Sequence, residues 1–166
     1  MEINLNSTYT HFRRKVVVIE QNQFKTASLL VKLGNAVTYY RNLKMENLDL
    51  TSVQSDAFIA TLRNPGITAS QLKDCLQLSQ STTAGIIARL ENKRLITKTL
   101  DKDDARKTFL TPTEEGLLLE TPLKKIAMET QQTLVEGMTE EEQEELIRLL
   151  QIALNNMNQI RTRKGL

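Results

Sequence analysis

Few residues in this sequence are of the types that carry out catalysis. His11 is the only histidine and Cys75 the only cysteine, and neither has carboxylates or thiols at the spacing of a metal site or a catalytic dyad. A glycine-rich phosphate-binding loop is also missing. We therefore expect no enzymatic activity, no metal and no cofactor. Because Cys75 lies beside Leu72 and Leu76 on an expected helix, a buried structural thiol is favoured over a redox sensor.

Hydroxyl and amide side chains gather at the start of another expected helix, over residues 79–90. Ser79 can act as its N-cap, but one cap needs one residue, which leaves Gln80, Ser81 and Thr82 for a different role. Such side chains bind phosphates or read the edges of bases, and a helix N-terminus adds amide groups that favour anions. Because the rest of the outer face is small and polar, this helix can lie close inside a groove of duplex DNA.

Basic residues also occupy the polar turn 101–107. Apolar and polar positions alternate on both sides of it, over 96–100 and 108–110, a pattern typical of a β-hairpin. At the tip of such a hairpin an arginine is attracted to the negative potential of a DNA minor groove, which makes Arg106 the strongest single candidate. Asp104 would be costly near phosphate unless it braces that arginine. The lysines of the turn could instead serve only solubility.

The remaining elements are predicted to be helices, because apolar residues recur every three or four positions. A stripe from Phe24 to Leu43 predicts a first long helix, whose start is uncertain because the run 16–19 is β-branched, and residues 1–8 are expected to be loose. Further helices are expected over 52–62 (Val53, Ala57, Phe58 and Leu62 inward), 68–76 (capped by Thr68), 79–90 (Thr83, Ile86, Ile87 and Leu90 inward), 113–136 and 140–160.

Two of these helices are short and joined by a tight turn at Gln77 and Leu78, which predicts a helix-turn-helix. Capping boxes are expected where the last two helices begin, the first with Thr111 or Thr113 as the cap. The last two helices carry apolar seams that require a partner helix. Their positions are Leu119, Leu123 and Ile126, then Leu146, Leu150, Ala153, Met157 and Ile160.

Composition limits the class of protein. The chain has 166 residues, 40% of them hydrophobic and 4% aromatic, so aliphatic side chains must build one core. Residues 113–147 carry ten acidic against two basic side chains, which places any nucleic-acid surface elsewhere. No apolar run approaches the roughly 20 residues of a membrane span, and the N-terminus is a poor signal peptide, so we expect a cytoplasmic protein.

Over roughly residues 24–160 the sequence resembles the MarR family of winged-helix regulators. The family's recognition-helix pattern is matched by Leu78-Ser79-Gln80-Ser81-Thr82 and by Arg89-Leu90-Glu91 before Leu95-Ile96. Its wing pattern is matched by Asp104-Ala105-Arg106, followed by Thr113-Glu114-Glu115-Gly116. Three positions depart from the family. Gly85 replaces a basic residue, Arg94 replaces a glycine so that this corner could be shaped differently, and Pro112 replaces a leucine.

The resemblance implies a mainly α fold with a small β-hairpin wing. Residues 51–112 would form the winged helix-turn-helix domain, and the segments 1–50 and 113–166 would hold a homodimer together. The implied function is that of a transcriptional regulator, a repressor by expectation, which binds a pseudo-palindromic operator in duplex DNA. The alternative is a winged helix that binds a protein partner instead of DNA.

The residues expected to act in each role follow from the patterns and the resemblance together. The DNA contacts would be Ser70, Gln71, Ser79, Gln80, Ser81, Thr82, Arg89, Lys98, Lys102, Asp104, Arg106 and Lys107. The dimer interface would contain Leu146, Leu150, Ala153, Met157 and Ile160. A small aromatic or anionic effector would bind beside Tyr39, Tyr40, Arg41 and Phe58, which could equally be core and surface residues.

Overall fold

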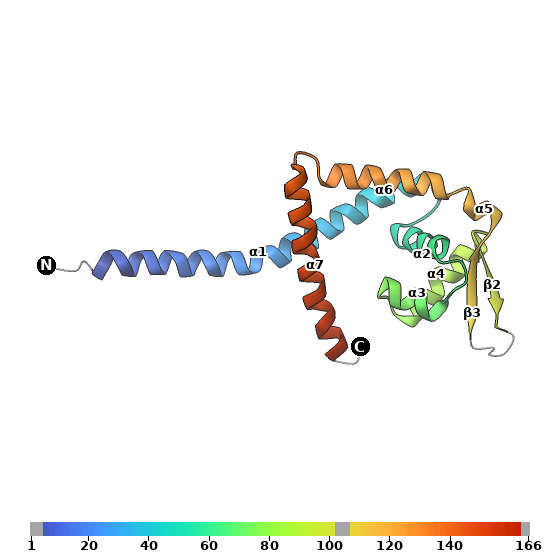
Figure 1. Cartoon of the computed structure of the whole chain (residues 1–166), viewed down its shortest axis with the longest axis horizontal. Helices are drawn as coiled ribbons and strands as arrows, with labels where there is room; N and C mark the ends of the chain where they lie inside the picture. The colour runs from blue at the N-terminus through green and yellow to red at the C-terminus, as the bar shows by residue number, and fades with distance from the viewer. Residues whose placement is uncertain (1–4, 102–106, 164–166) are drawn as a thin grey trace. The chain divides into compact units, whose positions relative to one another are not determined.

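The computed structural model describes residues 5–101 and 107–163, with the backbone alone for 5–24 and 161–163. The chain divides after Ile126 into two compact units. In chain order the elements are α1 (Leu5–Met45), η1 (Glu46–Leu48), α2 (Ser52–Arg63), β1 (Ile67–Thr68), α3 (Ala69–Leu76), α4 (Gln80–Asn92), β2 (Ile96–Leu100), β3 (Thr108–Pro112), α5 (Glu114–Leu117), α6 (Glu120–Leu134) and α7 (Glu140–Arg163), as Figure 1 shows. The expected class, helices with a small β-wing, is confirmed.

Helix α1 is longer than the sequence predicts. It begins at Leu5, well before Phe24, and ends at Met45. Residues 5–8, expected to be loose, are therefore helical, as is the β-branched run 16–19. The reason is that β-branching costs only a few tenths of a kcal/mol per residue, while each residue added to an existing helix gains a backbone hydrogen bond.

The first unit has a core built from α2, α3, α4, the sheet and α6. In α4, Thr83, Ile86, Ile87 and Leu90 are all buried, as predicted. Ala57 and Phe58 of α2 are also buried and Leu62 is half-buried, but Val53 is 39% exposed, so its predicted inward position is wrong. It lies in the first turn of α2, where Ser52, Gln54 and Ser55 are the buried residues. In this first turn, the polar residues at the helix start, and not the apolar stripe, determine which face of α2 lies inward.

The wing belongs to a three-stranded antiparallel sheet with the order β1-β3-β2. The predicted hairpin is confirmed as β2 paired with β3. Strand β1 was not predicted, because two residues are too few for any alternation to be visible in the sequence. Leu110 of β3 is fully buried and lies opposite both Ile67 of β1 and Lys98 of β2. This pairing fixes the base of the wing to the start of α3.

The single helix predicted over 113–136 is wrong, since α5 and α6 are separate helices. Thr113 is the N-cap of α5, accepting a hydrogen bond from the Gly116 amide at 2.9 Å, while Pro112 ends β3. This settles which threonine is the cap. Leu123 and Ile126 of α6 are buried in the first unit's own core, with Leu119 packed against it. The prediction that this seam needs a partner helix is therefore wrong: the winged-helix core already covers it.

The second unit contains α7, which ends at Arg163 and begins after Gly137, a residue with φ +84°. The predicted capping box is confirmed: the Thr139 amide donates to Glu142 at 2.9 Å, and the Glu142 amide donates to the Thr139 hydroxyl at 3.3 Å. Over the residues that the structure describes, no helix is long and apolar enough to cross a membrane.

Candidate nucleic-acid interface

The helix-turn-helix consists of α3, a short turn and α4. Thr68 caps α3 as predicted, and Gln71 completes a capping box in which its side-chain oxygen accepts from the Thr68 amide at 2.9 Å. Gln77 ends α3 in the left-handed conformation, with φ 54°. The turn then leads to Ser79, the N-cap of α4. Gln71 is thus held at the N-terminus of α3 beside Ser70, which is exposed.

Three hydroxyl groups meet at the N-terminus of α4. The Ser79 hydroxyl accepts from the Thr82 amide at 3.1 Å and lies 2.7 Å from the Thr82 hydroxyl and 3.1 Å from the Ser81 hydroxyl. Thr83, which is buried, donates to the Ser79 carbonyl at 2.9 Å. The cap therefore orders a row of hydroxyl groups whose outer members, Ser81 and Thr82, are exposed.

The outer face of α4 is small and polar. Gln80, Ser81, Ala84 and Arg89 are all exposed, and within the described part of the chain no ion pair occupies the Arg89 guanidinium. A Cβ added at Gly85 would meet nothing within 4 Å. The helix can therefore approach a flat or grooved ligand closely and offer it the exposed Arg89 guanidinium.

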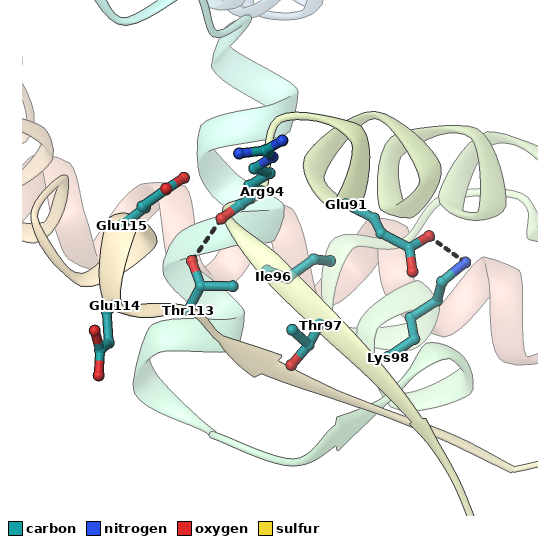
Figure 2. A pocket seen from close by; sticks show the side chains of 8 residues that line it. All are labelled: Glu91, Arg94, Ile96, Thr97, Lys98, Thr113, Glu114 and Glu115. Carbon is teal, nitrogen blue, oxygen red and sulfur yellow. Dashed lines mark hydrogen bonds and ion pairs between the residues drawn. The ribbon is translucent and has the colours of Figure 1, made fainter.

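On the wing, the described residues carry less uncompensated charge than the sequence suggests. Lys98 of β2 forms an ion pair with Glu91 of α4, Nζ to Oε2 2.5 Å (Figure 2). Lys107, immediately before β3, is exposed. The predicted contacts Lys102, Asp104 and Arg106 lie outside the described residues.

Arg94 shapes the corner between α4 and β2. It has φ 56°, the left-handed conformation that glycine adopts without strain. Its amide donates to the Glu91 carbonyl at 2.8 Å, and the following Leu95 amide donates to the Leu90 carbonyl at 3.0 Å. The corner is therefore a regular helix end of the glycine type, formed here by an arginine. The expectation that it could be shaped differently is wrong.

The same corner is bound to the start of α5. The Thr113 hydroxyl donates to the Arg94 carbonyl at 2.5 Å, and the Thr113 amide donates to the Leu95 carbonyl at 3.0 Å. Gly116 packs so closely that an added Cβ would lie 2.3 Å from the Leu95 carbonyl oxygen. These contacts explain why a threonine and a glycine stand three residues apart in the wing pattern.

Cys75 is exposed, so the prediction of a buried thiol is wrong. Only Leu72 is buried in α3, and Leu76 is half-buried. Because α3 is a short helix that buries a narrow stripe, Cys75 lies just outside that stripe.

The residues predicted to line an effector pocket lie in different surroundings. Arg41 of α1 makes two hydrogen bonds to the Asp56 carboxylate of α2, at 3.0 and 2.5 Å, and a third to the Ser55 hydroxyl at 3.1 Å. Phe58 is fully buried in the core, and Tyr39 is 72% exposed. The Tyr40 ring lies beneath Lys44, with Nζ 5.4 Å from its centre.

The residues predicted to form the dimer interface lie along α7. Leu146, Leu150 and Ala153 are half-buried, whereas Met157 and Ile160 are 63% and 50% exposed. Further apolar side chains, which the seam did not include, are also exposed on this helix: Ile147, Leu149, Ile152 and Leu154. Near its start, a hydrogen bond from Arg148 lowers the pKa of the Glu145 carboxyl.

Two residues that pair with predicted site residues were missed by the sequence reasoning. Glu91 was noted only as part of a family pattern, and nothing in its spacing shows that it pairs with Lys98. Asp56 was not singled out, although it neutralises Arg41. Both pairs join residues from different elements, so no local pattern could reveal them.

Comparison with known proteins gives consistent results. The family model described as MarR family matches residues 48–107. The chain is 27% identical over 125 residues to the uncharacterized HTH-type transcriptional regulator YybA of Bacillus subtilis (strain 168), covering 75% of this chain and 83% of that protein. Its structure is similar to that of a MarR transcriptional regulator from Methanosarcina mazei Go1, with a TM-score of 0.75 and 27% identity, and the match covers 81% of this chain and 97% of that one. It is also similar to the structure of MepR of S. aureus in a DNA complex, with a TM-score of 0.74 and 26% identity, and the match covers 78% of this chain and 96% of that one.

Proposed function

We propose that this chain, a winged helix-turn-helix protein that resembles the MarR family, is a transcriptional repressor that binds a pseudo-palindromic operator as a homodimer. The exposed polar face of α4 is the observation that carries the proposal, since the helix begins with an ordered row of hydroxyl groups and is followed in the chain by an antiparallel wing. The resemblance is to regulators and not to enzymes. Its place of action would be the cytoplasm, where the operator lies.

In this proposal α4 lies in the major groove and the wing reaches the adjacent minor groove. Gln80, Ser81 and Arg89 are exposed on α4 and can reach base edges or phosphates. Ser70, Gln71, Ser79 and Thr82 lie at helix N-termini, whose amide groups favour phosphate. Of the wing residues, Arg106 would supply the minor-groove contact, with Lys98, Lys102, Asp104 and Lys107 around it.

Residues 51–112 would thus read DNA, while 1–50 and 113–166 would join two copies. The apolar residues of α7 support this division, because a single chain leaves Met157 and Ile160 at least half exposed. A two-fold dimer presents its recognition helices with the same symmetry, so the half-sites should be centred about one helical turn, roughly 10 base pairs, apart.

Binding to duplexes selected from a random library tests the proposal. Fluorescence anisotropy should give a selected site that is pseudo-palindromic, and an affinity that falls steeply with salt because phosphate contacts release counterions. Arg106→Ala should weaken binding by on the order of 1–3 kcal/mol with little change in thermal stability. Gln80→Ala and Ser81→Ala should instead change which bases are preferred. If Arg106→Ala binds the same sites as tightly as the parent, this mode of DNA recognition is wrong.

The homodimer is tested by sedimentation at micromolar concentration. Charged substitutions at Leu150 and Met157 should dissociate or unfold the protein. A parent protein that sediments as a monomer would refute the dimer.

An effector, in this proposal, is a small aromatic or anionic molecule that releases the protein from DNA. Arg41 is the candidate for binding its charge, and Tyr39, Tyr40 and Phe58 lie on the same helix or on α2. Because Arg41 already binds Asp56, an anion must compete with that carboxylate. Thermal-shift screening of aromatic carboxylates is the check. A double substitution at Tyr40 and Arg41 that leaves every hit unchanged would exclude this pocket.

The alternative function is a winged helix that binds a protein partner. The ion pair of Lys98 favours it, because the wing then offers less free positive charge. Nonspecific duplex separates the two functions, since a protein-binding module should show no salt-dependent association with DNA.

A further inference from the structure

One ion pair connects the two elements proposed to contact DNA. Glu91 lies on α4 and Lys98 on β2, and their charged atoms are 2.5 Å apart. Both side chains are partly exposed, Lys98 by 37% and Glu91 by 39%. An ion pair with this exposure is weak because water screens it, so another anion can displace the Glu91 carboxylate from Lys98.

Among the residues that the structure describes, Lys98 forms an ion pair with one carboxylate, that of Glu91. Glu91 and Lys98 line a surface pocket that Glu114 and Glu115 also line. Figure 2 shows Glu114 and Glu115 on the other side of β2 from the ion pair, and within the described residues neither of them forms an ion pair. The Arg94 guanidinium points away from the Glu91 carboxylate in the same view. Lys98 is also held in register opposite Leu110, so its backbone position is fixed and its ammonium is the part that can move.

We propose that Glu91 competes with DNA phosphate for Lys98 and so sets the overall affinity of the protein for DNA. In the unbound protein the carboxylate neutralises the ammonium. Any duplex offers phosphate near the wing, so the competition lowers the affinity for DNA of every sequence. Only a site that also satisfies the base contacts of α4 would then be bound tightly. The inference rests on the proposed function, because it requires that the wing approaches DNA.

The decisive variant is Glu91→Gln, which keeps the shape of the side chain and removes the charge. Its affinity for a nonspecific duplex should rise about fivefold, the equivalent of roughly 1 kcal/mol for an exposed ion pair. One additional phosphate contact should also steepen the slope of log K against log salt by roughly 0.9. Affinity for the selected operator should rise by a similar factor, because the competition lowers the affinity of every sequence.

Two further variants separate competition from general electrostatics. Glu114→Gln removes one negative charge from the same pocket without freeing a lysine, and should change nonspecific affinity much less than Glu91→Gln does. Lys98→Gln should weaken nonspecific binding, and Glu91→Gln added to it should raise the affinity by no more than Glu114→Gln does in the parent. Circular dichroism checks that each variant is folded. If Glu91→Gln does not fold, Glu91→Ala replaces it, because alanine is the best helix former.

The outcomes distinguish this inference from the proposed function. If the parent binds DNA but Glu91→Gln shows the parent's affinity and salt slope, the competition is refuted and the function stands. An equal gain from Glu114→Gln, or an undiminished fivefold gain from Glu91→Gln in the Lys98→Gln background, also refutes it. If neither parent nor variants bind any duplex, the proposed function itself fails.

Discussion

Substituting Gly116 by alanine tests whether the corner between α4 and α5 is as closely packed as the contacts indicate. A Cβ at this position would lie 2.3 Å from the Leu95 carbonyl oxygen and 2.9 Å from Cζ of Phe58. Because the nearer atom is backbone, a side-chain rotation cannot relieve the clash. The segment at Leu95 must move, and the 3.0 Å hydrogen bond from the Thr113 amide to its carbonyl is then strained.

The change in the free energy of unfolding that we expect for Gly116→Ala is the sum of opposing effects. Overpacking costs typically about 1–3 kcal/mol, and a weakened hydrogen bond adds roughly 1 kcal/mol. Alanine regains at most about 1 kcal/mol of helix propensity. The free energy of unfolding should therefore fall by about 2–3 kcal/mol, which lowers the melting temperature by roughly 4–12 °C for a chain of this size.

Urea unfolding followed by far-ultraviolet circular dichroism measures this loss, since the chain has no tryptophan to report by fluorescence. Gly85→Ala in α4 is the matched control, because a Cβ there meets nothing within 4 Å. It should raise the free energy of unfolding by about 0.5–1 kcal/mol. If Gly116→Ala is as stabilising as Gly85→Ala, the close contact with Leu95 does not exist.

Three other substitutions or measurements follow from the structure. Arg94→Gly should raise the free energy of unfolding by about 0.5–1 kcal/mol, because the left-handed conformation costs a non-glycine residue more than glycine loses in chain entropy; destabilisation in a urea titration would count against it. Thr113→Ala should cost about 1–2 kcal/mol through the lost N-cap, and Thr113→Ser should recover most of it. The Cys75 thiol should react with a thiol reagent in the folded protein nearly as fast as in urea, and strong protection of the folded form would contradict its exposure.

The parts of the fold that the sequence predicts correctly depend on local chemistry. The caps at Thr68, Ser79 and Thr139 each use a side chain within three residues of the amide that it binds. The buried stripe of α4 is also visible as a helical period. Such features are determined by neighbours in the chain, so a single sequence contains the information.

The parts that the sequence does not predict depend on contacts between distant segments. Nothing near Ile67 indicates that it forms a strand, since its partner is Leu110. The break before α6 and the burial of Leu123 depend on a core assembled from several elements. The same is true of the candidate site: the exposed hydroxyl row was predictable, whereas the partners of Lys98 and Arg41 come from other helices.

Leu110 joins the base of the wing to the rest of the domain. Its strand is central in the sheet, so the base of the hairpin is hydrogen-bonded on both sides, and the Gly66 amide just before β1 also donates to the Leu110 carbonyl, at 2.8 Å. Backbone hydrogen bonds therefore join the base of the wing to β1 at the start of α3, so we expect these two elements to move together. In the proposed function, a signal that moves α3 would therefore move the base of the wing with it and leave the spacing between them constant.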